Sequence, residues 1–128
     1  MDGGARGNPG PAAAGAVVSS PAGDVLDETS ERIGDATNNV AEYRGLLLGL
    51  ARAGALGATE VDVVNDSELV ARQVTGEYKV KHAGIKPLHA QALAALAPFE
   101  HWSIRTVPRE QNARADELVN EALDAVGR

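Results

Sequence analysis

The first part of the chain shows the alternation of polar and apolar positions that is typical of strands. Two stretches, AAAGAVVSS and DVLDETSERIG, favour extended structure, and the turn-forming segment PAGD lies between them. Strands joined by so short a turn pair antiparallel. The pattern therefore predicts a β-hairpin near the start of the chain.

The next segment, NNVAEYRGLLLGLARAGALG, changes to a helical period. Apolar or small residues recur three or four positions apart, at Val40, Tyr43, Leu47, Leu50 and Gly54. Asn38 or Asn39 is expected to cap the start of this helix, and Gly57 to close it. The segment predicts the first long helix of the protein.

The second half of the chain alternates predicted strands and helices. TEVDVVND is predicted to be a short strand, and SELVARQVTG a helix that Ser67 caps and Gly76 ends. The polar, basic segment EYKVKHAGIK is predicted to be a loop. Four segments follow: a helix in PLHAQALAALAPF, a strand in HWSIRTV that buries Trp102, a loop in PREQNARAD and a terminal amphipathic helix in ADELVNEALDAVG.

The order of these elements indicates the fold class. Strands that helices separate pair in parallel, whereas the strands of a hairpin pair antiparallel. We therefore expect an α/β fold with a mixed sheet, antiparallel in the hairpin and parallel elsewhere.

Composition is that of an ordinary globular protein. The 128 residues, 44% hydrophobic and 23% charged, predict one domain over residues 1–128. Cysteine is absent, which excludes disulfides and Cys-based zinc sites and fits a reducing compartment. Because no apolar run reaches the roughly 18 residues of a membrane span and no signal-peptide pattern opens the chain, we expect a cytoplasmic protein without a membrane partner.

The net charge of −6 changes which partners are expected. Proteins that bind nucleic acid through its phosphates usually carry a basic patch, so the charge argues mildly against such a partner. It is compatible with a metal-dependent enzyme, because an acidic site adds negative charge that bound ions offset locally.

Acidic residues stand at the places where ligands gather in open α/β folds, the carboxyl ends of strands and the amino ends of helices. The four candidates are Asp2 before a Gly-rich loop, Glu42 in the first turn of the first long helix, Asp66 at the end of a strand and Asp116 near the start of the last helix. Converging carboxylates repel unless a cation lies between them, and oxygen ligands favour Mg²⁺ or Mn²⁺. Two such ions about 4 Å apart can support phosphodiester cleavage.

Each of these acids also has a structural interpretation, which is the more common one for any single position. Glu42 and Asp116 could complement helix dipoles. Asp66 could cap a turn or a helix, and Asp2 could be a terminal charge. Taken one by one, the residues leave both interpretations open.

Four segments, in order along nearly the whole chain, resemble ribonuclease H type I: DGGARGNPGP, ATNNVAEYRGLLLGL, VVNDSELVARQVTGEYKVK and VPREQNARADELVNEAL. They are most similar to the bacterial branch found as free-standing domains and, in some actinobacteria, fused to a phosphatase-like domain. The first two segments are highly specific as a pair, and the last is weaker by itself. The resemblance implies a ribonuclease H-like fold, with a mixed five-stranded sheet flanked by helices.

The resemblance also implies an activity and a metal centre. Such proteins are endoribonucleases that cut the RNA strand of RNA–DNA hybrids with four carboxylates and two Mg²⁺ (or Mn²⁺) ions, leaving 5′-phosphate and 3′-hydroxyl ends. By motif position the carboxylates are Asp2, Glu42, Asp66 and Asp116. Asp2 would bridge both ions, and Glu42 and Asp66 would hold the ion on the leaving-group side. Glu42 would also reach the ribose 2′-hydroxyl, and Asp116 would help to hold the ion that activates water.

The Gly-rich loop is implied to contact the substrate. Its glycines lack side chains, so the backbone of a duplex could lie close against Gly3, Gly4, Gly7 and Gly10. Asn8 would form a hydrogen bond in the minor groove. Recognition of this kind depends on duplex shape and 2′-hydroxyls and not on base sequence.

Further contacts are implied by the TNN motif. Thr37 would contact a DNA phosphate, and Asn38 and Asn39 would contact groove edges and sugars. Helix capping is the structural alternative for the two asparagines, and it can coexist with binding.

Basic residues contribute two further candidates. Lys79 and Lys81 lie in the loop after the second predicted helix, where they either contact the hybrid or are simply solvated. Arg109 could take the part in product release that a histidine has in many relatives, since this loop contains no histidine. The alternative for Arg109 is an ordinary surface arginine.

One departure from the family is the start of the chain. Relatives have several strand residues before the leading aspartate, but only Met1 precedes Asp2, so we expect a truncated first strand. The loss of ladder hydrogen bonds and apolar burial would destabilise the fold, and the N-terminal ammonium would lie beside the carboxylates. A second hypothesis is therefore a non-catalytic hybrid-binding module. We expect a monomer, and the sequence leaves open whether a fused domain follows Arg128.

Overall fold

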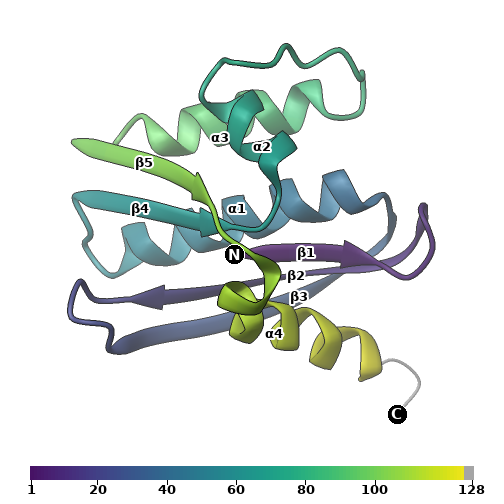
Figure 1. Cartoon of the computed structure of the whole chain (residues 1–128), viewed down its shortest axis with the longest axis horizontal. Coiled ribbons are helices and arrows are strands. Elements are labelled where there is room, and N and C mark those ends of the chain that lie inside the picture. Colours follow the sequence, from purple (N-terminus) through teal and green to yellow (C-terminus); the bar gives the residue numbers. More distant parts are fainter. Residues whose placement is uncertain (126–128) are drawn as a thin grey trace.

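The computed structural model describes residues 1–125. Its elements are β1 (Asp2–Ala5), β2 (Gly10–Ser19), β3 (Val25–Ala36), α1 (Asn38–Ala55), β4 (Glu60–Asn65), α2 (Glu68–Val74), α3 (Lys86–Leu96), β5 (His101–Thr106), the 3-10 helix η1 (Arg109–Asn112) and α4 (Ala113–Asp124) (Figure 1). The predicted order of strands and helices is confirmed. The short strand β1 precedes the predicted hairpin of β2 and β3, and η1 was not predicted.

The strands pair as the sequence predicts, antiparallel in β1–β2–β3 and parallel in β4–β5. β1 is short: Asp2 lies opposite Gly15, so β2 from Ala16 onward pairs with β3 alone. The mixed α/β fold is thus confirmed, while its five strands form two hydrogen-bonded groups. The groups meet where the Met1 ammonium donates to the carbonyl oxygen of Val64 at 2.8 Å.

Helices pack on both faces of the three-stranded group, with α1 on one face and α4 on the other (Figure 1). The small residues of β2 allow this close approach. Ala16 belongs to the core beneath α1 together with Tyr43 and Leu46, whereas Ala13 belongs to a smaller core beneath α4 with Val119. β2 is therefore buried from both sides, which fixes both helices relative to β1.

Two glycines set the spacing between β1 and α1. A Cβ on Gly3 would overlap the carbonyl oxygen of Ala41, and a Cβ on Gly45 would overlap the carbonyl oxygen of Asp2. The backbones of strand and helix consequently lie in direct contact. This contact brings Asp2 against the start of α1, where Glu42 lies.

The start of α1 differs from the prediction, whereas that of α2 agrees with it. Thr37 caps α1, because its hydroxyl accepts a hydrogen bond from the backbone N–H of Val40 at 3.3 Å. Asn38 is already the first residue of the helix, so the expectation that Asn38 or Asn39 caps it is wrong. Ser67 caps α2 as predicted. Threonine and asparagine are both good caps, and the sequence pattern did not separate them.

Two other expectations about the second half are corrected. Trp102 is 38% exposed on β5, an edge strand that pairs only with β4, so its assignment to the core is wrong. α4 begins at Ala113, earlier than predicted, and η1 lies within the segment expected to be a loop.

No helix within residues 1–125 has the length and apolar character needed to cross a membrane.

Candidate active site

Three of the four candidate carboxylates converge from three different elements. Asp2 opens β1, Glu42 lies on α1, and Asp66 follows the last residue of β4. One carboxylate oxygen of each lies within 4.8 Å of those of the other two. This spacing suits a single divalent ion held between oxygen ligands.

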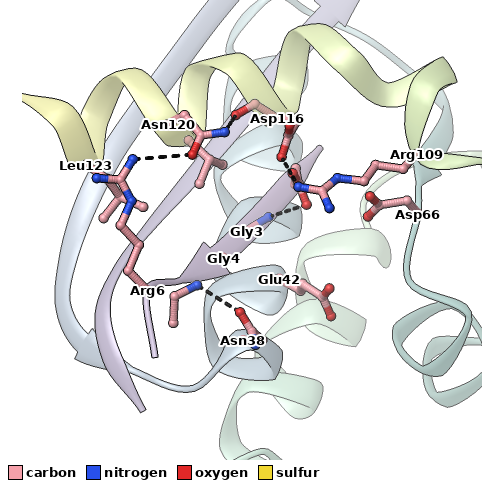
Figure 2. A pocket seen from close by; sticks show the side chains of 13 residues that line it. Gly3, Gly4, Arg6, Asn38, Glu42, Asp66, Arg109, Asp116, Asn120 and Leu123 are labelled. Carbon is pink, nitrogen blue, oxygen red and sulfur yellow. Dashed lines mark hydrogen bonds and ion pairs between the residues drawn. The ribbon is translucent and has the colours of Figure 1, made fainter. Parts of the chain in front are cut away.

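Asp116 lies in the same cavity but outside that close group. The cavity has a volume of about 270 Å³ and is lined by all four carboxylates. Asp116 accepts a hydrogen bond through Oδ1 from Nη2 of Arg109 at 3.3 Å. Figure 2 shows Arg109 extended between Asp116 and Asp66. The structure thus places an arginine cation on the Asp116 side of the cavity, where the resemblance to ribonuclease H implies a second metal ion.

A turn at the end of β4 positions Asp66. The buried Asn65 accepts a hydrogen bond through Oδ1 from the backbone N–H of Ser67 at 2.6 Å and donates through Nδ2 to the carbonyl oxygen of Arg105 at 3.3 Å. This side chain ties the turn to β5 and leaves the intervening Asp66 directed at the cavity (Figure 2). Asn65 was not among the predicted site residues, although an asparagine two residues before a helix cap is a signal for such a turn.

Asp2 is held by its own backbone and by η1. It is only 7% exposed, and its Oδ1 accepts from the backbone N–H of Gly3 at 2.9 Å. Asn112, another residue that the sequence analysis missed, donates through Nδ2 to the carbonyl oxygen of Met1 at 2.8 Å. These bonds fix the start of β1 beside the cavity.

Glu42 is the fifth residue of α1, one position beyond the first turn in which it was predicted. The first turn contains no acidic residue, so a role in complementing the helix dipole is not supported for Glu42. The side chain instead lines the cavity with Asp2 and Asp66.

The environment of the site opposes negative charge. Burial raises the pKa of Asp2 from 3.8 to about 7, and burial raises the pKa of Glu42 from 4.5 to about 7. The nearby charge of Asp66 raises both further. Without a cation these carboxyl groups hold protons close to neutral pH, and a divalent ion would favour their ionised forms.

These raised pKa values predict the pH dependence of the metal-free protein. Between about pH 4 and pH 7 the unfolded chain has released protons that the folded chain still holds. The contribution of Asp2 and Glu42 to the free energy of unfolding therefore falls as the pH rises, and is constant above about pH 7. Mg²⁺ binding should weaken as the pH falls below 7, because protons compete for the same oxygens.

Urea unfolding of the wild type and of Glu42→Gln, each in EDTA and in Mg²⁺, measures this effect. As the pH rises from about 4 to about 7 in EDTA, the free energy of unfolding should fall more for the wild type than for the variant. Mg²⁺ should reduce this loss. A wild type whose metal-free stability rises relative to the variant over the same range would contradict the prediction.

The glycines of β1 and of the turn that follows it have different surroundings. Gly4 lines the cavity, and a Cβ there would meet only Val119, at 3.7 Å, which agrees with an open surface. Gly3 packs against α1, and a Cβ on Gly10 would overlap the carbonyl oxygen of Arg6. Gly3 and Gly10 thus make room for the chain itself, although Gly3 also lines the cavity. The contact of these glycines with a duplex stays a prediction. Gly7 adopts a left-handed φ of 95° in the turn.

Two predicted substrate contacts have a role within the protein. Asn8 accepts a hydrogen bond through Oδ1 from the backbone N–H of Asn38 at 3.1 Å, and Asn38 accepts through Oδ1 from that of Ala5 at 2.8 Å. These bonds tie the loop to the start of α1. Of this pair only Asn38 lines the cavity.

Other predicted contacts lie outside the cavity. Thr37 and Asn39 are half-buried at the start of α1, and Lys79 and Lys81 are exposed in the loop between α2 and α3. Arg109 lines the cavity, as a functional role requires. Two polar lining residues, Arg6 and Asn120, were not predicted, because their positions in the chain gave no sign that they come together.

Most of the chain matches a known protein family, and a longer bacterial protein contains a similar segment. Residues 1–122 match the family described as reverse transcriptase-like. A bifunctional protein of Mycobacterium tuberculosis is 52% identical over 125 residues, which are 97% of this chain and 34% of that protein. The chain therefore spans about a third of the length of this relative.

Solved structures extend the comparison to the fold. RNase H1 from the halophilic archaeon Halobacterium salinarum has a TM-score of 0.94 and 44% identity, over 96% of this chain and 93% of that one. LC11-RNase H1, whose structure was solved in complex with an RNA/DNA hybrid, has a TM-score of 0.92 and 46% identity, over 96% and 93% of the two chains.

Proposed function

Because the chain belongs to the ribonuclease H type I family, we propose that it hydrolyses the RNA strand of RNA–DNA hybrids by a two-metal-ion mechanism, leaving 5′-phosphate and 3′-hydroxyl ends. The observation that carries this proposal is the group formed by Asp2, Glu42 and Asp66, with Asp116 in the same cavity. The hybrid bound to LC11-RNase H1 supports the choice of substrate.

The chemistry of the cavity fits Mg²⁺ or Mn²⁺. Every candidate ligand is a carboxylate, and hard oxygen donors select these ions. Asp2, Glu42 and Asp66 would hold one ion, and Asp2 with Asp116 the other. Ions bound there would supply an activated water and stabilise charge on the leaving oxygen.

The residues of the chain prepare the cavity for this reaction. Asn65 and Asn112 hold the elements that carry Asp66 and Asp2, so these carboxylates are oriented before substrate binds. Gly4 and Asn38 offer the hybrid a surface beside the carboxylates. Arg109, once a metal ion has taken its place at Asp116, would be free to hold a phosphate of the product.

A cleavage assay tests the proposal. The protein is incubated with a hybrid labelled on either strand, in Mg²⁺, in Mn²⁺ and in EDTA, with duplex DNA and duplex RNA as controls. Metal-dependent cutting of the RNA strand of the hybrid alone, with 5′-phosphate and 3′-hydroxyl ends, is expected. Hybrid binding without cleavage by a folded protein would instead favour the non-catalytic binding module.

A further inference from the structure

We propose that Arg6 binds a backbone phosphate of the cleaved strand, at the end of the cavity away from the metal ligands. This inference rests on the proposed function. Figure 2 shows α4 along one side of the cavity and β1 with Asn38 along the other. Arg109 and Asp66 lie at one end, and Arg6 lies at the opposite end beside Asn120. A strand that reaches the carboxylates and continues along α4 would pass Arg6.

The balance of charge around the cavity favours this role. Its charged lining consists of the four candidate metal ligands and two arginines, Arg6 and Arg109. Two divalent ions would neutralise the four carboxylates. Arg109 lies among those carboxylates, whereas Arg6 pairs with Asp124, which does not line the cavity. Asp124 offsets the charge of Arg6 locally, but with ions bound Arg6 is the basic side chain that lines the far end of the cavity, where an incoming polyanion needs hydrogen-bond donors.

The side chain of Arg6 is held in a way that leaves most of its donors available. Its Nη2 donates to Oδ1 of Asp124 at 2.7 Å and lies 3.4 Å from Oδ1 of Asn120. Nε and Nη1 make no hydrogen bond to the residues that the structure describes. These two nitrogens carry three of the five N–H groups of a guanidinium, and such a planar group can bind a phosphate through two hydrogen bonds at once.

The backbone beneath Arg6 is also fixed. The N–H of Arg6 donates to the carbonyl oxygen of Pro11 at 2.8 Å, which closes the loop between β1 and β2. Asn38 accepts from the preceding residue, Ala5, and ties the same loop to α1. Arg6 is thus presented from a rigid base, so little conformational freedom is lost when a phosphate binds.

Arg52 provides a matched control for Arg6. The side chains of both are 49% exposed and both pair with an aspartate, at 2.7 Å for Arg6 and Asp124 and 3.3 Å for Arg52 and Asp27. Arg52 lies on α1 outside the cavity. Replacing either arginine by alanine removes one surface charge and one ion pair, so only a contact with the substrate should distinguish the two variants.

The test is the steady-state cleavage of a labelled hybrid by the wild type, Arg6→Ala, Arg6→Lys and Arg52→Ala over a salt series. Arg6→Ala should raise KM about tenfold with kcat nearly unchanged, since it removes a charged hydrogen bond to substrate. Its plot of log(1/KM) against log salt should be shallower by about one, because one phosphate contact is lost. Arg6→Lys should keep the wild-type slope, because it keeps the charge. Arg52→Ala should match the wild type.

The other outcomes distinguish a failure of the role of Arg6 from a failure of the proposed function. If Arg6→Ala has the KM and salt slope of Arg52→Ala, or lowers kcat without raising KM, the role of Arg6 is overturned and the proposed function stands. A lysine variant with the shallow slope of Arg6→Ala would likewise overturn it. If the wild type cleaves no hybrid, the proposed function fails and the role of Arg6 fails with it. Thermal unfolding of each variant shows whether the fold is kept.

Discussion

Replacing Asp66 by asparagine is expected to lower the rate of RNA cleavage by orders of magnitude while leaving hybrid binding largely intact. The asparagine keeps the shape of the side chain but removes its negative charge, and with it a strong ligand from the group that Asp66 forms with Asp2 and Glu42. The turn should persist, because it is held by the side chain of Asn65 and the backbone of Ser67.

Asp62→Asn is the control for this experiment. Asp62 lies on β4, the strand that Asp66 follows, but it does not line the cavity. Its carboxylate accepts hydrogen bonds from Ser103 at 2.8 Å and from Arg105 at 3.1 Å. This variant should cleave at nearly the wild-type rate. An Asp66→Asn protein with near-normal turnover would remove Asp66 from the catalytic set.

The second large effect is expected in stability, from Gly45→Ala. The new methyl group would overlap the carbonyl oxygen of Asp2, so β1 must move away from α1. Such overpacking against backbone should lower the free energy of unfolding by about 3 kcal/mol or more. Because the shift also separates Asp2 from Glu42, any folded fraction should cleave RNA slowly.

Gly54→Ala, on the same helix, should have the opposite effect. A Cβ at this position meets no atom within 4 Å, so only the helix propensity changes, and stability should rise by about 0.5–1 kcal/mol. Urea unfolding followed by circular dichroism compares the two variants. Equal effects of the two substitutions would show that the contact between β1 and α1 does not need Gly45.

The sequence predicted those parts of the fold that depend on local periodicity. The hairpin, the long helix α1 and the cap at Ser67 follow from residues close together in the chain. The four carboxylates were singled out by their places at strand and helix ends, and by the motifs around them. Three of them do meet in space.

Features that depend on contacts between distant elements could not be predicted in this way. Trp102 resembles a core residue until β5 is known to be an edge strand. Gly3 looks like part of a flexible loop until α1 is found against it. Arg6 gains significance only beside Asp124, which lies 118 positions later in the chain. In each case the physical cause is a tertiary contact that no short segment encodes.

The most direct test of the account is anomalous scattering from crystals of the wild-type protein soaked in Mn²⁺. We expect one peak among the carboxylate oxygens of Asp2, Glu42 and Asp66, and a second between Asp2 and Asp116, with Arg109 displaced from Asp116. If saturating Mn²⁺ gives no peak between these side chains, they do not form a metal centre, and the proposed mechanism of cleavage is contradicted.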